Sequence, residues 1–323
     1  MNEDSCSTPR TWLVTGAAGF IGRHVMRLLT DRGASVVGIV RRNVKSSAEF
    51  LTRCDLEAEP EMLEDLLRKS APEVIIHLAG TNGTSGTDLW ELFASNVRPL
   101  LNLLTACRST LPGGRIAIVS SGAVYGHGPE RAPISEERRP APITPYGVSK
   151  LAAEIAALQH WRAYGVRVVI VRPFNVTGPG EPESFVTSAF ARQVARIERR
   201  EQQAVMRVGN LETVRDFLDV RDVADAVVQV AESGRAGQIY NVCSGRGVSP
   251  ADILAILTGL STVPLTIEQD AARMREVDIR SQVGDPAKVR DLLTWHPRYP
   301  LERTVFDVLE QWRTRVAGAG ATC

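Results

Sequence analysis

Short runs of apolar, often β-branched residues alternate with longer segments of helical hydrophobic spacing along the first half of the chain. The runs predict buried strands, and the segments between them predict amphipathic helices. The predicted strands are Thr11–Thr15, Ser35–Val40, Glu73–Ala79, Arg115–Ser120 and Arg167–Arg172. The predicted helices are Phe20–Arg32, Glu61–Lys69, Asp88–Arg108 and Tyr146–Tyr164. This alternation predicts an α/β fold with a Rossmann-type, doubly wound parallel sheet.

The regular alternation ends near residue 174. The later predicted helices are Val186–Arg199, Val223–Glu232, Pro250–Leu257 and Leu301–Arg315, and the later strands are Val205–Val208, Asp216–Val220 and Gln238–Val242. We interpret this part as a smaller α/β domain. The expected first domain is residues 1–174 with about 215–245, and the expected second domain, the one that would bind the substrate, is residues 175–214 and 246–323.

Two proline features interrupt the predicted elements. Pro99 lies inside the long predicted helix Asp88–Arg108, where it should kink the helix or cost about 3 kcal/mol. The segment Gly126–Pro145 contains five prolines and both charge signs, which predicts a loop.

Composition and charge exclude several classes of protein. The chain has 323 residues, with 38 basic and 37 acidic side chains and a formal charge of +1. A charge near zero without long basic runs argues against nucleic acid as the main partner. No apolar stretch approaches the roughly 18 residues of a membrane helix, and Met1–Arg10 is polar rather than signal-like. We therefore expect a globular protein that needs no membrane.

The cysteines and histidines indicate neither a disulfide framework nor a metal centre. The five cysteines are scattered and form no Cys-x-x-Cys pair, which is typical of reduced thiols in a cytoplasmic protein. The five histidines are isolated from one another and have no metal-ligand spacing. The sequence therefore predicts a cytoplasmic protein without a bound metal.

The glycines Gly16, Gly19 and Gly22 follow the first predicted strand and open the first predicted helix. Glycine permits a tight turn there and a close approach of backbone N–H groups to a pyrophosphate at the positive helix end. The spacing alone is weak, since about 0.16 such matches arise by chance. Gly80, Gly83 and Gly86 repeat it within a segment rich in Thr, Asn and Gly. Only the first set has the strand–turn–helix context that predicts a dinucleotide loop.

The end of the second predicted strand bears on the choice of coenzyme. A carboxylate there would accept a hydrogen bond from the ribose 2′-OH of NAD. The strand ends instead at Val40 and continues with Arg41 and Arg42. Guanidinium groups bind phosphate bidentately, so these arginines favour the 2′-phosphate of NADPH, with NADH remaining possible.

Tyr146 and Lys150 are one helical turn apart, so their side chains share a helix face. About 0.06 such pairs are expected by chance, and only four of the 38 basic residues are lysines. A tyrosine of unperturbed pKa near 10 is a poor acid–base group at neutral pH. A neighbouring ammonium should favour the phenolate and bring proton transfer into range. Ser121, just after a strand end, can hold the substrate oxygen that the tyrosine protonates or deprotonates.

These motifs together resemble the extended short-chain dehydrogenase/reductase family, whose members act on nucleotide sugars. The matching segments between residues 11 and 313 are Gly16–Gly22, Ser121 with Val124–Gly126, Tyr146–Lys150, Arg172–Gly180 and Arg215–Asp222. The resemblance implies that Tyr146 is the acid–base residue, that Ser121 binds the reacting oxygen, and that Lys150 also holds the nicotinamide ribose. The coenzyme-binding residues it implies are Gly16, Gly19, Phe20, Ile21, Gly22, Asp55, Leu56, Leu78, Ala79, Gly80, Asn96, Pro173 and Val176.

The second half of the chain looks most like the GDP-6-deoxy-4-keto-D-mannose reductases of this family, which make GDP-D-rhamnose. The resembling segments are Ser184–Arg192, Val208–Phe217 and Ile239–Gly245. By that likeness, the sugar nucleotide is held by Ser121, Asn175, Arg192, Arg215, Arg273 and Glu276. Arginines suit a diphosphate and a carboxylate suits a ribose.

The resemblance also bears on the reaction and the assembly. The 4,6-dehydratase members carry an acidic pair where this chain has Gly122 and Ala123, so elimination lacks its acid and base. We expect NADPH-dependent reduction at C4 of a GDP-4-keto-6-deoxyhexose. The alternatives are a C4 epimerase that retains NAD, a reductase of another 4-keto nucleotide sugar, and a relative that only binds NADPH. The family likeness further implies a homodimer paired through the helices Asp88–Arg108 and Tyr146–Tyr164.

Overall fold

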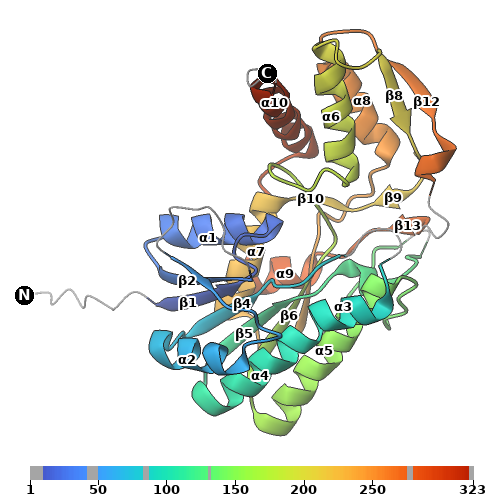
Figure 1. The fold of residues 1–323 in the computed structure, drawn as a ribbon. Helices are drawn as coiled ribbons and strands as arrows, with labels where there is room; N and C mark the ends of the chain where they lie inside the picture. Colours follow the sequence, from blue (N-terminus) through green and yellow to red (C-terminus); the bar gives the residue numbers. More distant parts are fainter. Residues whose placement is uncertain (1–9, 42–49, 83–86, 130–131, 275–278, 320–323) are drawn as a thin grey trace, which may run out of the picture. The chain divides into compact units, whose positions relative to one another are not determined.

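The computed structural model describes residues 10–41, 50–82, 87–129, 132–274 and 279–319. These residues belong to two compact units (Figure 1). The first unit comprises Met1–Ser121, Pro145–Arg172 and Ala224–Tyr240, and the second comprises Gly122–Thr144, Pro173–Val223 and Asn241–Cys323. The second unit includes Gly122–Thr144, which the expected domain division placed in the first, dinucleotide-binding domain; the functional division into domains stays a prediction.

A seven-stranded sheet in the order β11-β6-β5-β4-β1-β2-β3 forms the centre of the first unit. Its neighbouring strands from β6 to β3 pair in parallel. The strands are β1 (Thr11–Thr15), β2 (Ser35–Val40), β3 (Leu51–Arg53), β4 (Val74–His77), β5 (Arg115–Val119), β6 (Arg167–Pro173) and β11 (Ile239–Val242). The expected α/β class with a Rossmann-type parallel sheet is confirmed.

Helices cover both faces of this sheet (Figure 1). On one side, Leu63, Leu103 and Ala157 pack with strand residues such as Leu13 and Ile116 in one buried cluster. Those helices are α2 (Pro60–Ser70), α3 (Leu89–Asn96), α4 (Arg98–Thr110) and α5 (Pro145–Tyr164). On the other side lie α1 (Phe20–Asp31) and α7 (Val220–Ser233), which the 2.8 Å ion pair between Arg32 and Asp225 joins.

The single long helix expected over Asp88–Arg108 is wrong, because α3 ends at Asn96 and α4 begins at Arg98. Pro99 occupies the first turn of α4, where its missing N–H has no intrahelical acceptor to lose. The proline therefore starts a new helix instead of kinking a continuous one.

The second unit is built around the helices α6 (Val186–Glu198), α8 (Pro250–Leu260) and α10 (Leu301–Ala319). Phe190, Leu254, Leu257 and Leu309 belong to its buried cluster. Its strands are β7 (Asn175–Thr177), β8 (Val205–Val208), β9 (Val214–Arg215), β10 (Phe217–Asp219), β12 (Thr266–Gln269) and β13 (Ser281–Gln282). They form three two-stranded sheets, β10-β7, β12-β8 and β13-β9. The short helices are η1 (Gly122–Tyr125), η2 (Ala271–Arg273) and α9 (Ala287–Leu293).

No helix in the described ranges is long and apolar enough to cross a membrane.

Candidate active site

The first glycine loop lies in the first unit between β1 and α1. Gly16 has φ +68°, and a Cβ on it would lie 2.8 Å from the backbone nitrogen of Ala79. A Cβ on Gly22 would overlap the Gly16 carbonyl oxygen. Both positions therefore require glycine, the first for its backbone conformation and both for the close packing of the turn.

The N-terminus of α1 fits the pyrophosphate of a dinucleotide. The helix begins after Gly19, its N-cap residue, and neither a capping side chain nor an acidic residue occupies its first turn. Phe20 and Ile21 open the helix, so their backbone N–H groups belong to its positive end. A glycine cradle without side chains at an uncapped helix start matches the shape and charge of a bound diphosphate.

The end of β4 forms the wall beside this loop. The Leu78 N–H donates to the Thr15 carbonyl (3.2 Å), and the Ala79 N–H donates to the Thr15 hydroxyl (3.2 Å). Gly80 has φ +148°, and a Cβ there would lie 2.6 Å from Asn96 Oδ1. Leu78, Ala79 and Gly80 therefore bring backbone atoms close to the glycine loop, and their contact with a coenzyme stays a prediction.

Asn96 lies within α3 and uses its amide to hold the segment after Gly80. Its Oδ1 accepts from the Thr81 N–H (2.8 Å), and its Nδ2 donates to the Thr81 carbonyl and to Ser149 Oγ, both at 2.9 Å. Because Ser149 stands between Tyr146 and Lys150 on α5, Asn96 ties this segment to that helix. The geometry gives Asn96 a positioning role in addition to the coenzyme contact expected of it.

The residues expected at the adenine end follow β2 and β3, which are adjacent in the sheet. Arg41 is exposed directly after β2, and Arg42 lies outside the described residues. Asp55 Oδ1 accepts from the N–H groups of Glu57 (3.0 Å) and Ala58 (3.3 Å), which fixes the turn after β3. Leu56 is buried, and its carbonyl accepts from Asn102 Nδ2 at 2.7 Å. The turn thus presents Asp55 and Leu56 beside the end of β2.

Ser121, Tyr146 and Lys150 come together in the first unit. Lys150 Nζ donates to the carbonyl of Val119, the last residue of β5, at 2.8 Å. A Cβ on Gly80 would be 3.8 Å from that same Nζ, so the ammonium lies beside the end of β4 as well. Tyr146 lies one turn earlier on α5 and is hydrogen bonded to the Ser121 side chain. A phenol, a hydroxyl and an ammonium thus share the carboxyl edge of the sheet, where such folds bind ligands.

Burial shifts the pKa values of both Tyr146 and Lys150. Burial raises the pKa of Tyr146, and the opposing contribution comes from the hydrogen bond with Ser121 rather than from the Lys150 charge. Burial also lowers the pKa of Lys150 to about 8, although the negative charge of Glu154 opposes this shift. The expected effect of Lys150 on the Tyr146 phenolate stays a prediction; in this structure the ammonium donates to the Val119 carbonyl. Tyr146 is held as a protonated phenol, which suits an acid.

Two buried groups next to this site were not anticipated. Glu154, one turn after Lys150 on α5, forms a bidentate pair with Arg172 at 2.8 and 2.6 Å, and both side chains are 2% exposed. His77, at the end of β4, bonds through Nδ1 to the Thr15 hydroxyl at 2.9 Å. Burial and the Lys150 charge lower the pKa of His77 to about 3, so the ring is neutral and orients Thr15. For the Glu154–Arg172 pair, the only sequence signal is the four-residue spacing from Lys150 to Glu154. No sequence signal indicates the bond between His77 and Thr15.

The second unit holds the other expected ligands. Pro173 ends β6, and Val176 lies in β7. The Asn175 N–H donates to the Asp216 carbonyl (2.9 Å), and Arg215 Nη1 donates to the Val214 carbonyl (3.0 Å). Asn175 and Arg215 therefore lie on neighbouring backbone segments, joined through Asp216.

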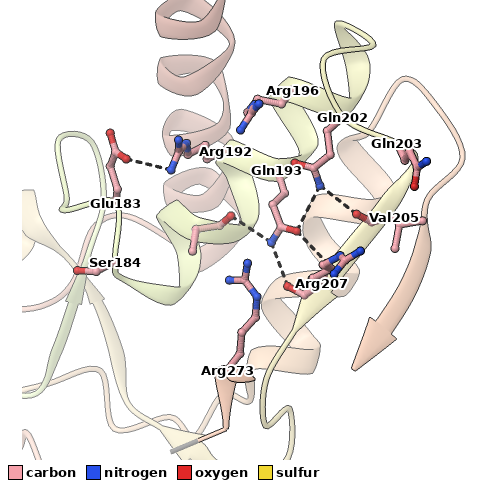
Figure 2. Close-up of a pocket in the computed structure, with 11 residues that line it drawn as sticks. Glu183, Ser184, Arg192, Gln193, Arg196, Gln202, Gln203, Val205, Arg207 and Arg273 are labelled. Carbon is pink, nitrogen blue, oxygen red and sulfur yellow. Dashed lines mark hydrogen bonds and ion pairs between the residues drawn. The ribbon is translucent and has the colours of Figure 1, made fainter. Parts of the chain in front are cut away.

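An open pocket of about 510 Å³ lies elsewhere in the second unit (Figure 2). Its lining residues are Glu183, Ser184, Ala189, Arg192, Gln193, Arg196, Gln202, Gln203, Val205, Arg207 and Arg273. It brings together two of the expected substrate ligands, Arg192 and Arg273, while Asn175 and Arg215 are not among its lining residues. Glu276 lies outside the described residues.

Gly122, the first position of the missing acidic pair, has little room for a side chain. Gly122 and Ala123 begin the short helix η1, and a Cβ on Gly122 would already lie 3.1 Å from the Phe174 ring. A side chain at residue 122 would require the Phe174 ring to shift by a few tenths of an ångström. Because neither Gly122 nor Ala123 carries an acid or a base, the expectation that this chain does not catalyse elimination stays a prediction.

Comparison with known proteins identifies relatives of the whole chain. The model of the family described as NAD dependent epimerase/dehydratase matches residues 12–243. The chain is 38% identical to GDP-6-deoxy-D-mannose reductase from Pseudomonas aeruginosa, over 94% of this chain and 97% of that protein. It is 32% identical to UDP-glucose 4-epimerase from Azospirillum brasilense, over 93% and 90% of the two chains. Its fold is similar to the structure of RMD from Pseudomonas aeruginosa complexed with NADPH, with a TM-score of 0.81, 34% identity and coverage of 95% and 99%.

Proposed function

Because the chain belongs to the NAD dependent epimerase/dehydratase family, we propose that it uses NADPH to reduce the C4 keto group of a GDP-4-keto-6-deoxyhexose. The reaction type is the conversion of GDP-4-dehydro-6-deoxy-D-mannose to GDP-D-rhamnose. The observation that carries this proposal is the gathering of Ser121, Tyr146 and Lys150 at the sheet edge that also bears the glycine cradle. Similarity to the Pseudomonas aeruginosa reductase along almost the full chain supports the sugar and the base.

NADPH bound in the first unit would supply the hydride that C4 receives. Gly16, Gly19 and Gly22 would receive the pyrophosphate, together with the start of α1 at Phe20 and Ile21. Arg41 and Arg42 would bind the 2′-phosphate, and Asp55 and Leu56 would flank the adenine. The remaining proposed contacts come from Leu78, Ala79, Gly80, Asn96, Pro173 and Val176.

Tyr146 would donate its proton to the C4 oxygen as that oxygen gains negative charge. The raised pKa of Tyr146 keeps the phenol protonated at neutral pH, so the proton is present when it is needed. Ser121 would hydrogen bond to the same oxygen and hold the carbonyl beside the phenol. Lys150, anchored at Val119, would hold the nicotinamide ribose and keep a positive charge near the forming alkoxide.

Asn175, Arg192, Arg215, Arg273 and Glu276 are the proposed ligands of the sugar nucleotide. Arg192 and Arg273 line the same pocket, so their guanidinium groups are placed to neutralise a diphosphate together. Arg215 and Asn175 are coupled through the Asp216 backbone.

A C4 epimerase that retains NAD is the second candidate, favoured by the likeness to UDP-glucose 4-epimerase from Azospirillum brasilense. An epimerase would return the electrons within one cycle and consume no coenzyme. A reductase would oxidise one coenzyme for each sugar reduced, including the case of another 4-keto nucleotide sugar.

Stoichiometric coenzyme oxidation is the decisive measurement. The purified full-length protein, mixed with a GDP-4-keto-6-deoxyhexose, should oxidise one NADPH per keto sugar, and NADPH should be used more efficiently than NADH. Absorbance of the reduced nicotinamide gives the rate and the stoichiometry. GDP-mannose, which has no keto group, is the control and should oxidise none. Sugar conversion without net coenzyme oxidation would replace the reductase by the epimerase.

The pH dependence of kcat/KM should show the titration of Lys150. Its pKa of about 8 lies below the ordinary lysine value, so the ammonium is present below pH 8 and is lost as the pH rises above it. We expect kcat/KM for reduction to fall about tenfold per pH unit above pH 8, since this parameter reports groups of the free enzyme. Fluorescence titration of NADPH binding at each pH separates this loss from unfolding. A profile that stays level through pH 9.5 would contradict the assignment.

We also propose a homodimer that works in the cytoplasm on a small-molecule nucleotide sugar, without a nucleic-acid partner. Exposed apolar side chains on the proposed pairing helices support the dimer, namely Leu89 and Trp90 of α3 and Ile155 of α5. The near-zero charge supports the absence of nucleic acid. The buried free thiols of Cys54, Cys107 and Cys243 are compatible with a reducing compartment.

A further inference from the structure

Arginine and glutamine side chains dominate the lining of the pocket in the second unit (Figure 2). Four of the lining residues are arginines and three are glutamines, while a single lining residue, Glu183, is acidic. Glu183 and Arg192 lie on one side of the view, and Gln202, Gln203 and Val205 lie on the other. The pocket therefore has an ionic end and an end rich in amides, where Val205 adds apolar surface.

The four arginines differ in their acidic neighbours. Three of them lie within ion-pair distance of a carboxylate, in the pairs Arg192–Glu183 (3.1 Å), Arg196–Glu201 (3.9 Å) and Arg273–Asp270 (3.2 Å). Within the described ranges of the chain, no such carboxylate partner is found for Arg207. Arg207 is therefore the pocket arginine with no carboxylate of the described residues within 4.0 Å, although Glu268 is its register partner on β12.

Gln193 fixes the backbone of Arg207. Its side chain is almost fully buried, its Oε1 accepts from the Arg207 N–H (2.9 Å), and its Nε2 donates to the Arg207 carbonyl (3.1 Å). One planar amide thus binds both backbone groups of a single residue on β8. The neighbours Met206 and Val208 are buried, so strand alternation turns the Arg207 side chain outward to the pocket.

Arg207 stands at the amide-rich end of the pocket. Gln202 Nε2 donates to the Val205 carbonyl (3.0 Å) and approaches Gln193 Oε1 at 3.5 Å, so both glutamines belong to the network around Arg207 (Figure 2). A nucleobase has apolar faces and a hydrogen-bonding edge, and it suits this end better than a diphosphate does. The diphosphate suits the end with Arg192.

The donor geometry of a guanidinium distinguishes the bases. Guanine presents two adjacent acceptors, O6 and N7, which an arginine fork binds bidentately. Adenine presents an acceptor beside a donor, so one arm of the fork meets a hydrogen. Uracil offers the single acceptor O4 on that side, next to the N3–H donor, and leaves one arm unpaired.

We propose that Arg207, positioned by Gln193, is a specificity-determining residue that binds the O6/N7 edge of guanine in the nucleotide of the substrate. The inference rests on the proposed function in taking a GDP-sugar as the substrate, and it assigns the choice of base to this one side chain.

Binding of free nucleotides tests the proposal without requiring turnover. Calorimetric titration of the full-length protein with GDP and with UDP gives the two dissociation constants for each variant. Arg207→Met should weaken GDP binding about 10- to 100-fold, the range of one bidentate arginine–guanine contact, and change UDP binding less than about threefold. Gln193→Met should reduce the preference for GDP in the same direction while NADPH binding is unchanged, because the side chain of Arg207 remains but its position is released.

Arg196→Met is the matched control, because it removes another arginine from the same pocket. It should change GDP and UDP binding by the same factor.

Equal weakening of GDP and UDP binding by Arg207→Met would assign Arg207 to the phosphates and overturn the proposal. Unchanged GDP binding in that variant would also overturn it. A wild-type preference for UDP would overturn it together with the GDP-sugar substrate. Selective GDP binding that depends on Arg207 in a protein that reduces no keto sugar would refute the reductase and leave the base assignment standing.

Discussion

Replacing Tyr146 by phenylalanine should lower kcat for keto-sugar reduction about 10²- to 10⁴-fold, the usual contribution of a positioned acid–base group. The variant keeps the ring and loses only the hydroxyl that would protonate the C4 oxygen. Burial raises the pKa of this hydroxyl, so in the wild type it carries its proton throughout the neutral range. Ser121 and Lys150 would remain to orient the carbonyl, but neither replaces the phenol proton at the same position. NADPH consumption under saturating substrate measures the effect.

Tyr164→Phe provides the control, since Tyr164 lies on the same helix but is exposed at its far end beside Arg108. That variant should keep the wild-type kcat. The dissociation constant of NADPH should be similar in both variants and the wild type, because the proposed coenzyme contacts of Lys150 and the glycine loop are intact. A Tyr146→Phe enzyme within threefold of the wild-type kcat would remove Tyr146 from the mechanism.

The first half of the fold was predictable because its signals are local. A buried parallel strand reads as a continuous apolar run, and β1 and β2 have the predicted bounds. The break between α3 and α4 was located by Pro99 but misread as a kink. In the second unit, β12 pairs with β8 across a long separation, and its four residues are all exposed, so no apolar run marks it. Short strands paired over long distances leave little trace in a local pattern.

In the candidate site, too, contacts within one helix could be predicted from sequence and long-range contacts could not. Tyr146 and Lys150 could be paired from sequence because four residues make one turn of a helix. The hydrogen-bond partners of Asn96 and Glu154 could not be predicted from sequence, because tertiary packing brings them together. Asn96 bonds to Ser149 on another helix, and Glu154 bonds to Arg172 on a strand. The effect of burial on pKa was equally hidden, because sequence shows which charges are near along a helix but not how much water remains around them.

Glu154→Gln should lower the free energy of unfolding by about 3–5 kcal/mol, the loss expected when one partner of a buried ion pair is removed. The Arg172 guanidinium would stay in a site where it is 2% exposed, without the carboxylate that neutralises it through two hydrogen bonds. Glu64→Gln is the matched control, because Glu64 forms an exposed pair with Arg68 one turn away on α2. That pair contributes about 0.3–0.5 kcal/mol at most. Denaturant unfolding of both variants compares them directly.

Removing both charges of the buried pair should be far less harmful than removing one. In the double variant Glu154→Leu with Arg172→Met, no unpaired charge remains, and apolar replacements of a buried ion pair are often close to neutral. The double variant should therefore be more stable than Glu154→Gln.

Both variants should also show a lower pKa of Lys150, because in the wild type the Glu154 charge raises this pKa against the effect of burial. Without that charge, the fall in kcat/KM should begin at a lower pH than in the wild type. A Glu154→Gln protein as stable as Glu64→Gln, with an unshifted pH profile, would show that the pair supports neither the fold nor the lysine.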